Sequence, residues 1–154
     1  MEYKCEINEL PEQPVLAVRT RSSVFKLPKV LGIIFEKFDK RFKELGEEPA
    51  GAPFVAYYNM NMFNLDIEIG FPVTKVLQDD QEIKAGKIPA GKFAVVMHQG
   101  PYSKIRPAYD ALKKFIKSQD KKATGVAYEY YLNDPKITKP EDLLTRVVFP
   151  LKPD

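Results

Sequence analysis

The sequence predicts an α+β protein built from tandem duplicated βαββ units with antiparallel sheets. The order strand, helix, strand, strand occurs twice along the 154 residues, and matching positions of the two runs lie 78 residues apart. A hydrophobic content of 44% is sufficient for a packed core. Because a small sheet cannot cover its apolar face alone, we expect one domain over residues 1–154 with pseudo-twofold symmetry. A duplicated unit of this kind also predicts a central ligand groove along its axis.

The first copy is expected at about residues 5–76. Residues 15–21 (VLAVRTR) follow a proline and are rich in β-branched side chains, which predicts a strand. Apolar residues at three- and four-residue spacing predict an amphipathic helix over about 28–45. Two further strands are predicted at 54–59 and 65–73.

The second copy is expected at residues 93–151, after a linker over 77–92. Residues 93–98 (FAVVMH) predict a strand, and an apolar stripe over 105–116 predicts the second helix. Two strands complete the copy, at 126–132 (VAYEYYL) and 145–151 (TRVVFPL).

A constant spacing supports duplication more strongly than a shared order of elements. Two strand pairs and two helix pairs are separated by 78 residues: Val15 and Phe93, Phe71 and Phe149, Ile34 and Leu112, Phe38 and Ile116. One such match can arise by chance. Four matches at one spacing point to an internal repeat.

Composition excludes several classes of protein. With 24 Lys and Arg against 21 Asp and Glu, the net charge of +3 is too small for a dedicated phosphate-backbone binder, so no direct nucleic-acid partner is expected. Cys5 cannot form an internal disulfide, and one Cys with one His cannot build a structural zinc site. We therefore expect no metal and no cofactor. Without a long apolar run or a signal peptide, we expect no membrane partner and a cytoplasmic location.

Five segments carry a resemblance to a known family: HQGPY (98–102), AYDALKKFI (108–116), YEYYLNDP (128–135), DLLTRVVFPL (142–151) and DIEIGFPV (66–73). Together they resemble the GyrI-like small-molecule-binding family. The stand-alone members of this family are relatives of the effector-binding domain of AraC-type and MerR-type regulators. The most specific parts are H-x-G-P-Y before the second helix and E-x-Y-L-N-D-P on the following strand.

The resemblance implies the same duplicated fold and a groove for hydrophobic, aromatic and often cationic organic molecules. Some members of the family antagonise toxins or inhibit gyrase, and others are hydrolases that open strained cyclopropane rings. The residues before Val15 are too few for a helix-turn-helix. The leading expectation is a cytoplasmic protein that sequesters or senses such molecules. The alternatives are a hydrolase and a protein-interaction module whose partner is a regulator or gyrase, because a fold does not determine a function.

Glu129 is the first candidate for a ligand contact. Strand alternation puts Glu129 and Tyr131 on one face, where a carboxylate would attract an organic cation and a tyrosine ring would stack on it. The resemblance also implies that Glu129 is the ligand-contacting acid of the family. In the hydrolase alternative, Glu129 would activate a water and Tyr131 would assist the leaving group. The competing interpretation is a solvent-facing acid on an antiparallel sheet.

Glu68 is the second candidate acid, since it has the same place in the alternation of the first copy. The residue 78 positions later is Arg146, where relatives often carry an acid. Two interpretations stay open at this stage. Glu68 either faces the ligand or pairs with Arg146.

Tyrosines are the remaining candidates for the groove. Tyr57 and Tyr58 lie on a predicted strand, and Tyr102 lies in the loop that enters the second helix. A buried ring with a wet hydroxyl suits a planar ligand, although aromatic residues also favour strands for structural reasons. His98 has no nucleophile in a recognisable motif and is interpreted as a structural residue of the H-x-G-P-Y turn.

Overall fold

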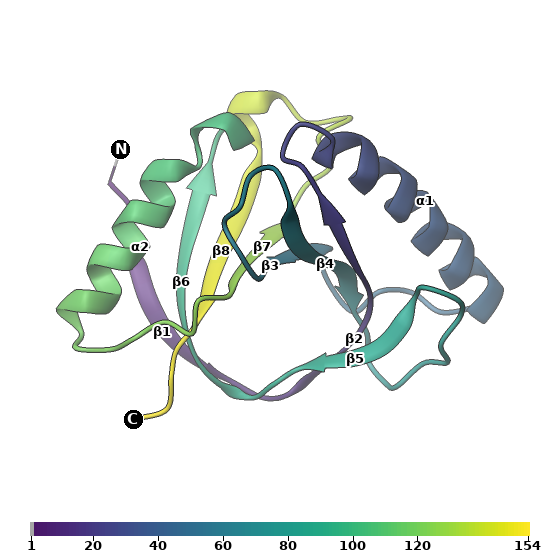
Figure 1. Ribbon diagram of the computed structural model, residues 1–154, viewed down its shortest axis with the longest axis horizontal. Coiled ribbons are helices and arrows are strands. Elements are labelled where there is room, and N and C mark those ends of the chain that lie inside the picture. The colour runs from purple at the N-terminus through teal and green to yellow at the C-terminus, as the bar shows by residue number, and fades with distance from the viewer. Residues whose placement is uncertain (1) are drawn as a thin grey trace. The chain divides into compact units, whose positions relative to one another are not determined.

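The computed structural model describes residues 2–154 and is shown in Figure 1. Its strands are β1 (Cys5–Leu10), β2 (Gln13–Ser22), β3 (Phe54–Tyr57), β4 (Leu65–Pro72), β5 (Lys84–Ile88), β6 (Gly91–Gln99), β7 (Ala127–Tyr131) and β8 (Leu144–Pro150). Its helices are α1 (Leu27–Leu45) and α2 (Arg106–Ser118), with short 3-10 turns η1 (Tyr102–Lys104) and η2 (Pro140–Asp142). The predicted α+β class and the strand, helix, strand, strand order of both copies are confirmed. None of the helices in residues 2–154 is long and apolar enough to span a bilayer.

The elements form two compact units. The N-terminal unit spans Glu12–Pro89, and the C-terminal unit comprises the chain up to Pro11 together with Ala90–Asp154. Strand order is β3-β4-β2-β5 in the N-terminal unit and β7-β8-β6-β1 in the C-terminal unit. The strands within each sheet pair in antiparallel fashion, as predicted.

Helix α1 packs through aromatic side chains in the N-terminal unit. Phe38 and Phe42 recur one turn apart, and both rings meet the edge of Phe71 on β4, with centroids 5.2 and 5.5 Å apart. Gly46 ends the helix in the left-handed region at φ 64°, a conformation that glycine adopts without steric cost. The helix thus covers the face of the sheet to which Phe71 belongs.

Helix α2 covers its sheet in the same way in the C-terminal unit. The buried residues Ala108, Leu112 and Ile116 follow each other at four-residue spacing along one side of the helix. Tyr109 packs against Phe149 of β8 with ring centroids 5.5 Å apart. Leu112 and Ile116 are the helix positions that the sequence repeat predicts for the core, and the structure buries both.

The pairing register of β2 with β4 is repeated by β6 with β8 at the same 78-residue spacing. Val15 pairs with Pro72 in the N-terminal unit, and Phe93 pairs with Pro150 in the C-terminal unit, so both partners shift by 78 residues. Identical register is the structural counterpart of the constant spacing, because a slip of one residue would reverse the face of every side chain. The duplication predicted from the sequence therefore extends to backbone pairing.

The segment expected to be a linker, residues 77–92, contains a strand that the sequence analysis missed. This strand, β5, lies at the same 78-residue spacing from β1, but each pairs with the other copy. Gln13 of β2 pairs with Ile88, and Gly91 of β6 pairs with Leu10. Each compact unit thus takes its outer strand from the other copy. The strand was missed because only Ile88 of KAGKI is buried, which leaves little alternation to detect.

Strands β3 and β7 depart from the common spacing. Phe54 pairs with Gly70, whereas Tyr128 pairs with Val148, so β7 lies four residues closer to its helix than the repeat requires. The connection from β7 to β8 is correspondingly longer than that from β3 to β4, as expected. By this pairing Tyr57 corresponds to Tyr131. Glu129 corresponds to Val55, so it has no acidic counterpart.

Candidate functional site

Glu129 lies in the middle of β7, on the face that α2 covers. It is only 9% exposed, and its carboxylate accepts hydrogen bonds from the hydroxyls of Tyr109 on α2 and Tyr131 on the same strand, the latter at 3.0 Å. Tyr128 and Tyr130 stack on each other with centroids 6.3 Å apart, and alternation along the strand directs them to the opposite face. Tyr131 and Glu129 thus share a face as predicted. That face is buried, so the interpretation of a solvent-facing acid is wrong.

Burial raises the pKa of the Glu129 carboxyl above its ordinary value of 4.5, because removal from water disfavours the charged form. The hydrogen bonds from Tyr109 and Tyr131, and a smaller electrostatic contribution from His98, lower the pKa of Glu129 and oppose that shift. Among residues 2–154, the ion pairs made by Lys and Arg side chains do not include Glu129. The carboxyl is therefore held by neutral donors in a site that disfavours its charge.

Tyr102 extends this group of tyrosines toward solvent. Its ring meets Tyr131 edge to face at 5.5 Å between centroids, and the side chain remains 37% exposed. Burial raises the pKa of the Tyr102 hydroxyl, with smaller contributions from the negative charges of Asp134 and Glu129. We call Glu129, Tyr102, Tyr109 and Tyr131 the Glu129 cluster.

His98 holds the turn that places Tyr102. It is 2% exposed, and its Nε2 lies 3.0 Å from the carbonyl oxygen of Pro101. A carbonyl can only accept, so Nε2 carries a proton, and in the neutral ring Nδ1 accepts from the Tyr3 hydroxyl at 3.2 Å. Gly100 supplies a backbone φ of 130° that the turn requires. The partners of His98 agree with the structural interpretation of this residue.

Glu68 belongs to a separate polar group in the N-terminal unit. Its carboxylate accepts a hydrogen bond from Tyr58 at 2.9 Å, and the guanidinium of Arg19 lies 3.7 Å from the centroid of the Tyr58 ring. Arg19 also donates two hydrogen bonds to Asp66 at 2.7 and 2.8 Å. Alternation puts these side chains on the sheet face opposite α1.

Two candidate residues remain outside both groups. Tyr57 lies one residue before Tyr58 and therefore on the α1 side of the sheet. Arg146, the expected alternative partner of Glu68, lies in the C-terminal unit with its guanidinium 5.2 Å from the centroid of the Tyr130 ring. Contact of Glu68 with a ligand and the central groove itself both stay predictions.

Tyr109 is the member of the cluster that sequence analysis missed. It lies beside Ala108 in the apolar stripe of the second helix, where an aromatic residue is expected to be core. Only the packing of α2 on β7 reveals that its hydroxyl reaches Glu129. In residues 2–154 there is no group of three or more His, Cys, Asp or Glu side chains placed to hold a metal ion.

Comparison with known families matches nearly the whole chain. Residues 3–152 match the family described as the GyrI-like small molecule binding domain. The chain belongs to this GyrI-like family. None of the curated proteins compared with the chain matches it.

Several solved structures share the GyrI-like fold of this chain. The C-terminal domain of EcmrR is 22% identical with a TM-score of 0.78, covering 99% of both chains. EcmrR in its complex with DNA has a TM-score of 0.82 at 22% identity, but 97% of this chain spans only 57% of that longer chain. At 22% identity, the likeness to both EcmrR structures shows a shared fold.

Two further relatives carry informative descriptions. A structure described as a hydrolase from Listeria innocua is 15% identical with a TM-score of 0.72, covering 97% of this chain and 92% of the other. SAV2435 bound to tetraphenylphosphonium is 12% identical with a TM-score of 0.63, covering 99% and 94% of the two chains. At these identities the likeness shows the fold alone.

Proposed function

We propose that this protein binds hydrophobic, aromatic organic cations and thereby sequesters or senses them, with Glu129 as the group that selects for positive charge. One observation carries the proposal: a buried carboxylate that no Lys or Arg within residues 2–154 neutralises is surrounded by tyrosine rings. A structural acid in such a place is normally paired. A cationic ligand would supply the missing charge.

The energetics favour a cation over a neutral molecule of equal shape. Burying an ionised carboxylate without a counter-charge is unfavourable, and a cation in contact would relieve that cost. The faces of Tyr102 and Tyr131 add cation–π attraction of about 0.5–2 kcal/mol. The Tyr109 and Tyr131 hydroxyls keep the carboxylate oriented, which limits the reorganisation needed on binding.

Entry of a ligand requires movement, since the carboxylate is covered. Tyr102 is the most exposed member of the cluster and lies on the short turn η1, outside the regular helix. We therefore assign it the role of a movable cover over Glu129. Within the N-terminal unit, ligand contacts of Glu68 and Tyr58 on the sheet face opposite α1, and of Tyr57 on the α1 face, stay predictions.

The relatives support this choice of ligand and role. Tetraphenylphosphonium, named with SAV2435, is an aromatic cation of the proposed class. EcmrR, named in a complex with DNA, suggests sensing, although this chain spans about half of that regulator. In the sensing role, a partner protein such as a regulator or gyrase would recognise the ligand-bound form of this protein.

The test uses calorimetry with tetraphenylphosphonium and its neutral analogue triphenylphosphine oxide. Glu129→Gln keeps the shape of the side chain and removes its charge, so we expect affinity for the cation to fall about tenfold to a hundredfold. Affinity for the neutral analogue should hardly change. Glu36→Gln, at an exposed acid of α1, is the matched control. Equal losses for both ligands would show that Glu129 acts through shape, and would overturn the proposal.

A hydrolase is the second candidate, favoured by the raised pKa of a carboxyl hydrogen-bonded to two tyrosines. A carboxylate whose pKa is raised is a stronger base than an ordinary one, as general-base catalysis requires. Glu129 would take a proton from water, and the water oxygen would bond to a cyclopropane carbon as a C–C bond of the strained ring breaks. The electron pair of that bond would pass to the rest of the substrate, where the Tyr131 hydroxyl would donate a proton. Product formation from a cyclopropane substrate, absent in Glu129→Gln, would establish this activity.

A further inference from the structure

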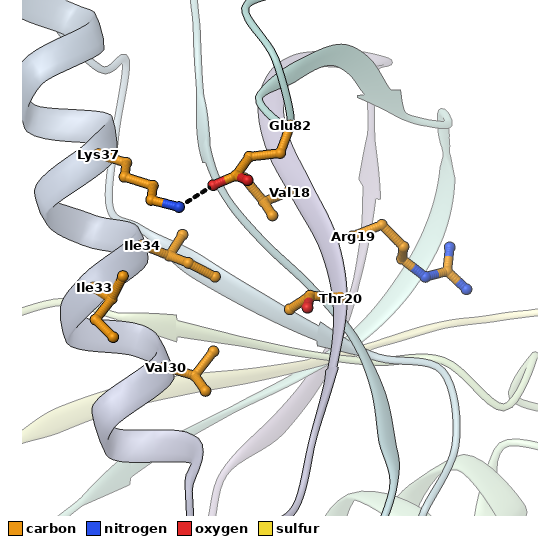
Figure 2. A pocket seen from close by; sticks show the side chains of 8 residues that line it. All are labelled: Val18, Arg19, Thr20, Val30, Ile33, Ile34, Lys37 and Glu82. Atoms are coloured by element: carbon orange, nitrogen blue, oxygen red, sulfur yellow. Dashed lines mark hydrogen bonds and ion pairs between the residues drawn. The ribbon is translucent and has the colours of Figure 1, made fainter.

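A slot of about 270 Å³ lies between α1 and β2 in the N-terminal unit (Figure 2). Val18 and Thr20 of β2 point toward the helix, and Val30 and Ile34 of α1 point toward the strand, with Ile33 at the rim. Arg19 points to the other side of β2. The walls of the slot are thus mainly aliphatic, with the Thr20 hydroxyl on the strand side.

An ion pair closes one side of the slot. Lys37 Nζ and Glu82 Oε1 are 2.5 Å apart, with both side chains about half exposed. The charges at this mouth therefore cancel each other. Arg19, the remaining charged residue at the slot, is bound to Asp66 on the other face of the sheet.

Several positions of the C-terminal unit that align with the slot are aromatic. At the 78-residue spacing, Thr20 corresponds to His98, Lys37 to Phe115, and Gln81 to Tyr3. His98 is 2% exposed and its ring stacks with that of Tyr3 at 6.2 Å between centroids. At these three aligned positions, the C-terminal unit therefore has aromatic residues and the N-terminal unit has none.

Larger helix residues compensate only in part. Val30 and Ile33 stand where the C-terminal copy has Ala108 and Ala111, yet Ile33 remains 47% exposed. In the C-terminal unit, Ala108 and Leu112 are fully buried at the corresponding surface of α2. Apolar surface beside α1 is thus exposed, whereas the corresponding surface beside α2 is covered.

We propose that the slot between α1 and β2 is a second ligand site, specific for small neutral aromatic molecules of the phenol or indole class. The bound ring would take the place that His98 and Tyr3 fill in the other copy. Its hydroxyl or N–H group would meet the Thr20 hydroxyl. Neutrality follows because the Lys37–Glu82 pair offers no net charge, in contrast to Glu129. The site does not depend on the cation site proposed above.

Titration with indole, followed by NMR of isotope-labelled isoleucine methyl groups, tests this site. We expect saturable shifts at Ile33 and Ile34, with a dissociation constant on the order of 1 mM or below. Ile105, next to Tyr102 in the C-terminal unit, should not shift. Shifts concentrated at Ile105, or none at Ile33 and Ile34 up to the solubility of indole, would overturn the proposal.

Substitutions of Lys37 distinguish the effect of filling the slot from the effect of breaking the Lys37–Glu82 ion pair. Lys37→Phe introduces the ring found at this place in the other copy and should weaken indole binding at least tenfold. Lys40→Phe, an exposed position of the same helix outside the slot, should leave it unchanged. Lys37→Gln breaks the ion pair without filling the slot and should bind within about twofold of wild type.

Two results would contradict the proposal at this stage. Retained indole binding in a folded Lys37→Phe protein would show that indole binds elsewhere. Equal losses in Lys37→Gln and Lys37→Phe would show that the ion pair, and not the apolar slot, binds the probe. Tetraphenylphosphonium binding should be unaffected by Lys37→Phe, so failure of the cation site and failure of this site give different results.

Discussion

Tyr109 on α2 donates a hydrogen bond to the carboxylate of Glu129 on β7, so the helix is bonded to the acid that it covers. The two residues are 20 positions apart, and this hydrogen bond joins the helix to the sheet beside the apolar helix residues Ala108 and Leu112. Tyr109 is therefore a direct link between α2 and the carboxylate of Glu129.

Loss of the Tyr109 hydroxyl should destabilise the protein. Tyr109→Phe removes one of the two tyrosine hydroxyls that donate hydrogen bonds to the buried carboxylate of Glu129. We expect a loss of about 1–3 kcal/mol in the free energy of unfolding at neutral pH. Urea denaturation measures this value. Tyr102→Phe, at a more exposed ring, is the matched control and should cost less. A Tyr109→Phe protein as stable as wild type would contradict the role assigned to this bond.

Stability should depend on pH through Glu129. Its pKa is raised in the folded state above the ordinary value of 4.5, so the folded protein binds the proton more tightly than the unfolded chain does. The contribution of Glu129 to the free energy of unfolding therefore falls as pH rises from 4.5 through the folded-state pKa. Above the folded-state pKa this loss of stability stays constant. Glu129→Gln should remove this dependence.

The measurement is the difference in unfolding free energy between Glu129→Gln and wild type across pH. Glu129→Gln should be more stable than wild type at neutral pH. This difference in the free energy of unfolding should become smaller as pH falls toward 4.5. Other groups, such as Asp66 with its lowered pKa, titrate in both proteins and cancel in the difference. A difference that stays constant over this range would contradict the raised pKa of Glu129.

His98 should matter for stability and hardly for ligand affinity. His98→Gln retains a polar side chain but loses the ring that bonds Pro101 and Tyr3, so a modest loss of about 1–2 kcal/mol is expected. Tetraphenylphosphonium affinity should stay nearly unchanged. Complete loss of binding in a folded variant would reassign His98 to the binding site.

Removal of residues 1–10 should expose one strand and not its counterpart. β1 covers the edge of β6, whereas β2 is covered by β5, so amide exchange should accelerate in Gly91–Gln99 and remain slow in Gln13–Ser22. Hydrogen exchange with mass spectrometry resolves the two segments. Faster exchange in β2 than in β6 would contradict the crossed pairing of the outer strands.

The sequence by itself determined the fold class, the duplication and the residues that share a face. Constant spacing reports common descent of two segments, and alternation along a strand follows from backbone geometry, so both are local properties that a sequence carries directly. Glu129 and Tyr131 could be placed side by side for this reason. The strand β5 escaped detection because one buried residue in five gives no alternating pattern.

Tertiary structure alone decided which face is covered and by what. Alternation puts Glu129 on one of two faces, but only the packing of α2 makes that face the buried one and brings Tyr109 to the carboxylate. Exchange of β1 and β5 between the copies likewise depends on pairing between residues distant in the chain. Such contacts follow from the competition of all possible long-range pairings, which no short segment encodes.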